Sequence, residues 1–264
     1  MKSSIIAAGA LFAATALAAP GTKARFDRHQ KRAEARKGNL RLDGTSAPTT
    51  KVGVDGEVKH VEYSENWAGA VLSESGWTKV VGTITVPTPV NTGKSGSGSA
   101  WVGIDGDTCD TAILQTGIDW TISSSGSVSY DAWYEWYPAA SFDFSGITIS
   151  AGDSLTFTVT ASSTSGGTAV IENNTKGTSV SKTFSGESNK LCEYDAEWIV
   201  EDYEEGNSLV AFADFGTVTF TNAAAYKGST AYGVTGATII DIEQNSVLTS
   251  CSTSGSSTVT CTYK

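Results

Sequence analysis

Three short segments of this 264-residue chain combine carboxylates with large aromatic side chains, and such groups together can move protons and hold a substrate. The segments are residues 101–105 (WVGID), 130–137 (YDAWYEWY) and 196–202 (AEWIVED). If each is a β-strand, alternate side chains point to opposite faces. The residues that then share a polar face are Trp101 and Asp105 in the first segment, Asp131, Trp133, Glu135 and Tyr137 in the second, and Glu197 and Glu201 in the third.

Carboxylates placed between aromatic rings are costly to bury unless they line a wet groove. The solvated surface of an edge strand would explain any one of these carboxylates. Three segments with the same pattern favour a functional groove instead, in which the carboxylates serve as proton carriers.

The rest of the chain excludes most other hydrolytic chemistry. Both histidines, His29 and His60, lie in the first 60 residues, so the remainder has no Ser-His-Asp triad, no Cys-His pair and no His-ligated zinc. The paired Asp-Thr/Ser-Gly loops of pepsin-like peptidases are also missing, and residues 115–117 (QTG) have an amide in place of that aspartate. The sequence has no phosphate-binding glycine loop, and we expect neither a metal ion nor a cofactor.

The elements that position these residues are expected to be β-strands. The chain has 33 Ser, 34 Thr and 28 Gly but only 17% charged residues, which is typical of an all-β domain with many turns. The Gly/Ser-rich stretch 91–99 is expected to be a long exposed loop. We expect a sandwich or barrel, with single strands near residues 77–86, 237–242 and 257–263 and pairs of strands within 147–160 and 209–221.

The charge distribution divides the chain into two parts. Residues 1–61 carry a net charge of +6 and residues 62–264 a net charge of −16, and all five Arg lie in the first part. Residues 1–19 have a Lys near the start, an apolar centre and an Ala-Leu-Ala end, as in a secretory signal peptide. We therefore expect a secreted, extracellular protein.

Residues 20–60 are basic, contain few large apolar side chains and include the dibasic pair Lys31-Arg32. They are either a disordered tail or a cationic prosegment that lies over an acidic cleft as an intramolecular inhibitor. We favour the prosegment, because the two opposite charges belong to one translated chain. Residues 61–264 then form a single mature catalytic domain, which we expect to be a monomer.

Membranes and nucleic acids are not expected partners. After the signal peptide no apolar run approaches the roughly 20 residues of a membrane-spanning helix. An acidic domain without Arg is also poorly suited to contact phosphates.

The four Cys of a secreted chain are expected to form two disulfides. Cys251 and Cys261 bracket an expected terminal hairpin, so we pair them, which leaves Cys109 with Cys192. The sequence contains one glycosylation sequon, Asn173-Asn174-Thr175, which makes Asn173 a candidate for a glycan.

Six strings of the chain closely resemble the fungal glutamic peptidases, the eqolisins. They are YSENWAGAVL, WVGIDGDTCD, TAILQTG, YDAWYEWYP, CEYDAEWIVEDYEEG and LVAFADFGTVTFTNA, and they occur in the family's order from about residue 63 to the C-terminus. The resemblance implies a concanavalin-like sandwich of two antiparallel sheets whose concave face forms the substrate groove. It also implies a catalytic pair, Gln115 and Glu197, and a set of groove residues, namely Trp101, Asp105, Asp119, Asp131, Trp133, Glu135 and Tyr137.

What the resemblance implies is an acid endopeptidase that acts on proteins and is insensitive to pepstatin. Glu197 would take a proton from a water held between it and Gln115, and the Gln115 amide would donate to the developing oxyanion. The four other carboxylates of the set would hydrogen-bond around this pair, while Trp133 and Tyr137 shape the groove. Two alternatives remain open: a β-sandwich glycoside hydrolase, since paired carboxylates beside aromatic rings also suit sugar cleavage, and a non-catalytic glycan-binding module.

Overall fold

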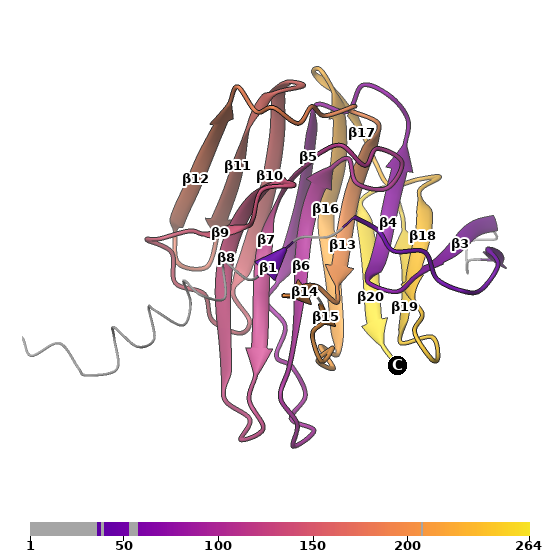
Figure 1. Cartoon of the computed structure of the whole chain (residues 1–264), viewed down its shortest axis with the longest axis vertical. Coiled ribbons are helices and arrows are strands. Elements are labelled where there is room, and N and C mark those ends of the chain that lie inside the picture. The colour runs from indigo at the N-terminus through magenta and orange to yellow at the C-terminus, as the bar shows by residue number, and fades with distance from the viewer. Residues whose placement is uncertain (1–35, 38–39, 53–57, 207) are drawn as a thin grey trace, which may run out of the picture.

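The computed structural model describes residues 36–37, 40–52, 58–206 and 208–264, so the expected signal peptide lies outside the described residues. The described residues form twenty strands and no helix, and most of the strands belong to two stacked sheets (Figure 1). Within these ranges there is accordingly no apolar helix long enough to cross a bilayer. The expected all-β sandwich is confirmed.

One sheet has nine strands among the described residues, in the order β2-β3-β18-β4-β13-β6-β7-β8-β9. Neighbouring strands are antiparallel, as expected, except β3 and β18, which run parallel. These two strands lie far apart in the sequence, so no hairpin forces them to run in opposite directions. The strands are β2 (Thr49–Val52), β3 (Val58–Ser64), β4 (Trp67–Ser73), β6 (Gly96–Ile104), β7 (Ile113–Ile122), β8 (Val128–Tyr137), β9 (Phe142–Asp143), β13 (Asp195–Glu201) and β18 (Thr238–Ile242).

The second sheet has eight strands in the described part of the chain, ordered β12-β11-β10-β5-β16-β20-β19, with β17 beside β16. A small third sheet pairs the N-terminal β1 (Arg36–Lys37) with β14 (Glu204–Glu205), which in turn pairs with β15 (Ser208–Leu209). The strands of the second sheet are β5 (Lys79–Thr85), β10 (Ser154–Ser163), β11 (Gly166–Asn173), β12 (Thr178–Ser185), β16 (Thr217–Lys227), β17 (Thr230–Tyr232), β19 (Thr249–Ser254) and β20 (Thr258–Tyr263).

The main core lies between the two large sheets and follows the alternation of the strands. Every second residue of β5 and β10 is buried, as the apolar pattern predicts. From the nine-stranded sheet, Trp198 of β13 enters this core with no exposed surface, and its Nε1 donates to the carbonyl of Val81 in β5 over 2.8 Å. This hydrogen bond therefore ties the strand that carries Glu197 to the opposite sheet. Burial of a large apolar side chain stabilises the fold by roughly a further 1.5–3 kcal/mol.

Three expected elements differ in the structure. Residues 147–150 are not a strand, because Ser150 and Asp153 close a turn in which the Asp153 carboxylate accepts the Ser150 N–H. Residues 209–221 contain only the end of β15 and the start of β16, since residues 210–213 run beside the beginning of β6 instead. Ser97 is buried beside these residues and Ser99 is buried within the sheet, so the exposed loop expected at 91–99 ends where β6 begins.

Asn173 is corrected from a glycan candidate to a structural residue. Its side chain is 1% exposed, and its Nδ2 atom donates to the Thr148 carbonyl and to the Asp153 carboxylate. Because a glycan would be attached to this same nitrogen, the folded chain has no room for it there.

Candidate active site

The nine-stranded sheet has an outer face, opposite the main core, on which the predicted site residues meet. A row of four residues crosses it in register: Glu197 of β13 lies opposite Gly103 of β6, Gly103 opposite Gln115 of β7, and Gln115 opposite Glu135 of β8. Since neighbouring strands lie about 4.8 Å apart, the backbones of Gln115 and Glu197 are separated by about 10 Å with only a glycine between them. Two long side chains therefore face each other across a gap.

Gly103 keeps that gap open, and sequence analysis did not single it out. A Cβ at this position would lie 3.1 Å from Glu197 Oε2 and 2.7 Å from the Trp101 ring. Any side chain there would thus push against the Trp101 ring and the Glu197 carboxyl, so only glycine lets both lie this close to the backbone between Gln115 and Glu197. The available signal was a glycine within an otherwise regular strand, which often marks a place where another group approaches the backbone closely.

Gln115 is fully buried and is oriented by its neighbour in the row. Its Nε2 donates to Glu135 Oε2 over 3.3 Å, which leaves the second Nε2 hydrogen for another acceptor. Its Oε1 has no hydrogen-bond partner among the described residues, so this oxygen can accept a hydrogen bond from a bound water. The amide thus offers one donor and one acceptor toward the gap.

Glu197 is also fully buried, and neither carboxyl oxygen makes a well-formed hydrogen bond with the described residues. Burial raises the pKa of Glu197 well above its ordinary value, and the nearby carboxylates of Asp195, Asp107 and Asp105 raise it further. The backbone N–H of Asp107 lowers the pKa of Glu197, but this effect is smaller than each of the effects that raise it. The closed arrangement therefore favours the protonated form of Glu197.

Aromatic and aliphatic side chains surround the row and form a second apolar cluster on the outer face. Trp67 packs edge-on against Trp101 at 5.0 Å between ring centroids, and Trp101 Nε1 donates to Glu201 Oε2 over 2.8 Å. We call the set the outer-face cluster. Its buried members are Trp67, Val71, Trp101, Ile113, Trp133, Ile199 and Ile240, with Leu40 and Tyr137 packed against them.

The structure gathers most, but not all, of the predicted groove residues around the row that contains Gln115 and Glu197. Asp119 and Asp131 face each other on β7 and β8, four residues from Gln115 and Glu135. At about 3.4 Å per residue they lie roughly 13 Å along the strands from the row. They belong to the same face but to its far end.

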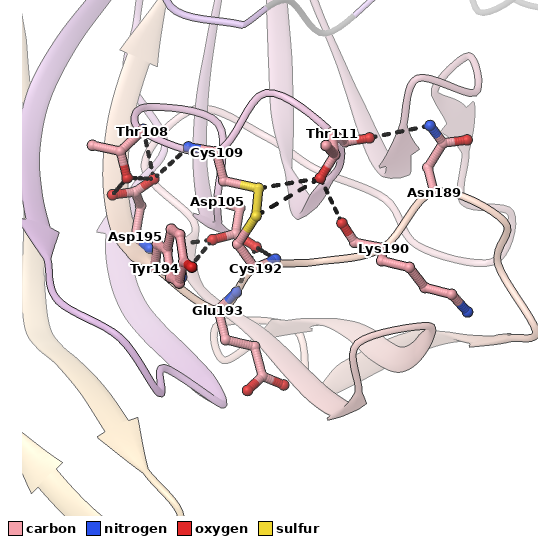
Figure 2. The surroundings of a disulfide bond; sticks show 10 residues. All are labelled: Asp105, Thr108, Cys109, Thr111, Asn189, Lys190, Cys192, Glu193, Tyr194 and Asp195. Atoms are coloured by element: carbon pink, nitrogen blue, oxygen red, sulfur yellow. Dashed lines mark hydrogen bonds between the residues drawn. A yellow bond between two sulfur atoms is a disulfide. The ribbon is translucent and has the colours of Figure 1, made fainter.

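Asp105 has a different role from the one expected at the groove (Figure 2). It follows β6 with φ 69°, and its carboxylate accepts the backbone N–H groups of residues 192–195 at 2.7 to 3.2 Å. Burial raises the pKa of Asp105, and these four hydrogen bonds oppose that rise. Asp105 thus fixes the loop that leads into β13, two residues before Glu197.

Two further interactions hold the loop of residues 192–195 in place. A disulfide joins Cys109 to Cys192, and the Asp195 carboxylate accepts the N–H of Thr108 over 2.7 Å (Figure 2). A second disulfide joins Cys251 to Cys261 across the β19–β20 hairpin, so both pairs are those expected from the sequence. Residues 105–109 and 192–195 therefore form one tied unit beside Glu197.

Solved structures with this fold identify the class of protein. Scytalido-glutamic peptidase, solved with a transition state analog inhibitor, matches with a TM-score of 0.71 and 48% identity over 76% of this chain and 98% of that chain. Aspergilloglutamic peptidase from Aspergillus niger matches with a TM-score of 0.62 and 60% identity over 64% and 99% of the two chains. The protein is a β-sandwich endopeptidase of the glutamic type.

Sequence comparisons identify the family within this class. Residues 65–263 match the Peptidase A4 family, and the chain belongs to that family, the eqolisins. Aspergillopepsin-2 of Aspergillus niger is 52% identical over 291 residues, with all of both chains covered. Scytalidopepsin B of Scytalidium lignicola is 46% identical over 257 residues, with 94% of this chain and 93% of the relative covered. The two sugar-directed alternatives are therefore not retained.

Proposed function

We propose that this chain is a secreted zymogen of an acid endopeptidase in which Gln115 and Glu197 activate a water molecule to hydrolyse peptide bonds. The row Glu197–Gly103–Gln115 is the observation that carries the proposal. It brings one titratable group and one amide to the two sides of a glycine, against which the Trp101 ring and the Glu197 carboxyl lie.

The proposed reaction uses one carboxylate twice. Glu197 in its ionised form takes a proton from a water that also donates to Gln115 Oε1, and the water attacks the scissile carbonyl. The free Nε2 hydrogen of Gln115 donates to the oxyanion, while Glu135 holds the amide in this orientation. Protonated Glu197 then gives its proton to the leaving amine, and no covalent intermediate forms.

The amide in this pair has a consequence for pH and for inhibition. Gln115 cannot titrate, so its donor remains available at acid pH. Because the site lacks the aspartate pair of pepsin-like peptidases, we expect pepstatin not to inhibit it.

The zymogen part of the proposal is supported by the closure of the outer face. Gln115 and Glu197 have no exposed surface, although a protein substrate must reach both. Leu40, from the expected prosegment, packs against the outer-face cluster beside them. The boundary expected between residues 60 and 61 stays a prediction, and it falls inside β3.

Opening this face would also change the chemistry of Glu197. Burial is the largest cause of its raised pKa, so entry of water brings the pKa back toward its ordinary value. The group can then act as a base at acid pH in the open form, whereas in the closed form it remains protonated. Secretion rests on residues 1–19, the expected signal peptide.

The decisive experiment is the Glu197→Gln variant of the full chain, assayed with an internally quenched peptide at acid pH. Each general acid or base role is worth about 10²–10⁴-fold, and one residue performs both here, so we expect activity to be lost. An unchanged circular dichroism spectrum serves as the control for folding. A folded variant that retains more than about a tenth of wild-type activity contradicts the role of Glu197 as proton carrier.

A further inference from the structure

Residues 40–46 lie against the outer face through a compact set of contacts. Leu40 packs on the outer-face cluster, which contains Trp67 and Trp101. Among the described residues of the expected prosegment, Leu40 is the one whose side chain packs against this cluster. An apolar side chain of the N-terminal segment therefore occupies space beside the catalytic row.

Arg41 binds two carboxylates next to that position. Its Nη1 lies 2.7 Å from Asp107 Oδ1 and its Nη2 lies 2.6 Å from Glu62 Oε2. The Arg41 and Asp107 side chains are each 9% exposed, whereas Glu62 is 34% exposed. Breaking an ion pair this deeply buried is far more costly than breaking one on the surface, because a desolvated charge is left without a partner.

The loop that Arg41 contacts is the tied unit that also surrounds Glu197. Asp107 lies between Asp105 and Thr108, both of which are hydrogen-bonded to the loop before β13. The negative charge of Asp107 also acts on Glu197. Arg41 is therefore held by a rigid part of the site, not by a mobile surface carboxylate.

Asn66 fixes the backbone on both sides of Arg41. Its Oδ1 accepts the Leu42 N–H over 2.8 Å, and its Nδ2 donates to the Leu40 carbonyl over 3.2 Å. The Leu42 carbonyl in turn accepts the Glu65 N–H over 2.9 Å. Asn66 is fully buried, so the segment is aligned by a rigid side chain at the start of β4.

We propose that residues 40–42 are the latch that holds the N-terminal segment on the catalytic face, with Leu40 in the outer-face cluster, Arg41 on Asp107 and Glu62, and the backbone on Asn66. This inference deepens the proposed function and rests on it, since a latch regulates the enzyme only if this face binds substrate. It differs from inhibition by the summed charge of the basic segment, because it assigns the hold to specific contacts of Leu40, Arg41 and the backbone of residues 40–42.

The latch also accounts for release by acid. The charged groups that face Arg41 are Asp107 and Glu62, and those that face Asp107 are Arg41, Asp195, Glu62 and Glu197. Burial raises the pKa of Asp107, while Arg41 opposes that rise. As the pH falls, Asp107 takes up a proton while Arg41 keeps its charge, so the guanidinium loses its most deeply buried anionic partner and the hold of the segment on the face weakens.

The test uses full-length Glu197→Gln protein, which cannot cut its own N-terminal segment under the proposed mechanism. Hydrogen exchange of the peptide covering residues 40–46 is compared at pH 6.5 in this background, alone and with Arg41→Gln or Arg28→Gln. Arg28→Gln is the matched control, because it removes the same charge elsewhere in the basic N-terminal segment and so tests inhibition by summed charge. We expect exchange about 10- to 100-fold faster with Arg41→Gln and less than about twofold faster with Arg28→Gln.

Exchange in β7 and β10 shows whether each variant is folded. If Arg41→Gln does not fold, Glu62→Gln replaces it, since it removes the half-buried partner and is expected to accelerate exchange at residues 40–46 by about threefold or more. Equal effects of the Arg41 and Arg28 substitutions, or unchanged exchange in the latch variants, overturn the latch.

A second measurement separates this outcome from failure of the proposed function. In the otherwise wild-type full chain, Arg41→Gln is expected to cleave an internally quenched peptide at a higher pH than the parent, and Arg28→Gln is not. If exchange shows that the latch opens but no variant cleaves the peptide at any pH, the proposed function fails and the docking contact stands. If all chains cleave with the same pH profile, the latch does not regulate activity.

Discussion

The spacing of the proposed catalytic pair, Gln115 and Glu197, depends on the residue between them. Gly103 leaves a gap that an added methyl group would narrow at Glu197 Oε2 and at the Trp101 ring. A rigid site tolerates little displacement, because a shift of about 1 Å in a reacting group can lower the rate about 10²-fold.

Gly103→Ala is therefore expected to lower kcat/KM by about 10²-fold or more while the chain still folds. The measurement is peptide cleavage at acid pH, together with thermal unfolding. Gly146→Ala is the control for loss of stability alone: its φ of 89° makes an Ala costly to the fold, but nothing lies within 4 Å of the added Cβ, so its activity should stay near that of the wild type. Near-normal activity of Gly103→Ala would show that the gap is not needed.

Substitutions of Gln115 distinguish an oxyanion donor from a binding residue. Gln115→Ala removes the donor and the water acceptor together, so kcat is expected to fall at least about 10²–10³-fold. Gln115→Glu tests whether a second titratable carboxyl can replace the amide, and we expect it to remain impaired wherever that carboxyl is ionised. A rise in KM with kcat unchanged in Gln115→Ala would assign Gln115 to substrate binding alone.

At the scale of elements, the position of Glu197 depends on the loop that leads into β13. Asp105, Asp195 and the Cys109–Cys192 disulfide tie residues 105–109 to residues 192–195. The Cys251–Cys261 disulfide closes a hairpin at the other end of the chain. The two disulfides thus offer a comparison between a crosslink beside the site and one away from it.

Replacement of both Cys109 and Cys192 by Ala is expected to reduce activity and to lower the free energy of unfolding by about 4–5 kcal/mol, from the loop that the disulfide closes. The same change at Cys251 and Cys261 closes a much shorter loop and is expected to lower it by about 3 kcal/mol with activity retained. Denaturant unfolding and peptide cleavage of the two double variants provide the measurement. Equal losses of activity would mean that the loop before β13 does not position Glu197.

At the scale of the whole molecule, buried carboxyl groups make the fold more stable in acid. Asp202, which follows β13, is 1% exposed, and Gln244 Nε2 donates to it over 2.8 Å. Burial raises its pKa from 3.8 to about 7, against the effect of that hydrogen bond. Glu197 contributes in the same direction, because burial raises its pKa as well.

The folded chain therefore binds the Asp202 proton more tightly than the unfolded chain does. This contribution to stability is complete below about pH 4 and is lost as the pH rises toward 7, with a total on the order of 4 kcal/mol. Asp202→Asn keeps an acceptor for Gln244 but cannot ionise, so its unfolding free energy should fall less between pH 4 and pH 7.5. Thermal or urea unfolding in a Glu197→Gln background gives the comparison, and identical pH profiles of parent and variant would contradict the assignment.

Strand alternation alone sorted several site residues correctly. It separated Glu197 and Glu201 from the core residues Trp198 and Val200, because a side chain in a strand can face only one of two directions. It could not place Asp105, since β6 ends one residue earlier and φ 69° turns this side chain toward the loop before β13. Where a strand ends, the backbone changes direction, and the alternation of side chains along the strand no longer predicts which way the next side chain points.

The sequence by itself determined the all-β class, the division of charge between the two parts of the chain, and the resemblance that identified Gln115 and Glu197. These features depend on composition, on local alternation and on motifs within single segments. Only the tertiary structure decided that Gly103 lies between Gln115 and Glu197 and that Arg41 meets Asp107. Both depend on the pairing of segments far apart in the sequence, which is fixed by register and packing across the whole sheet.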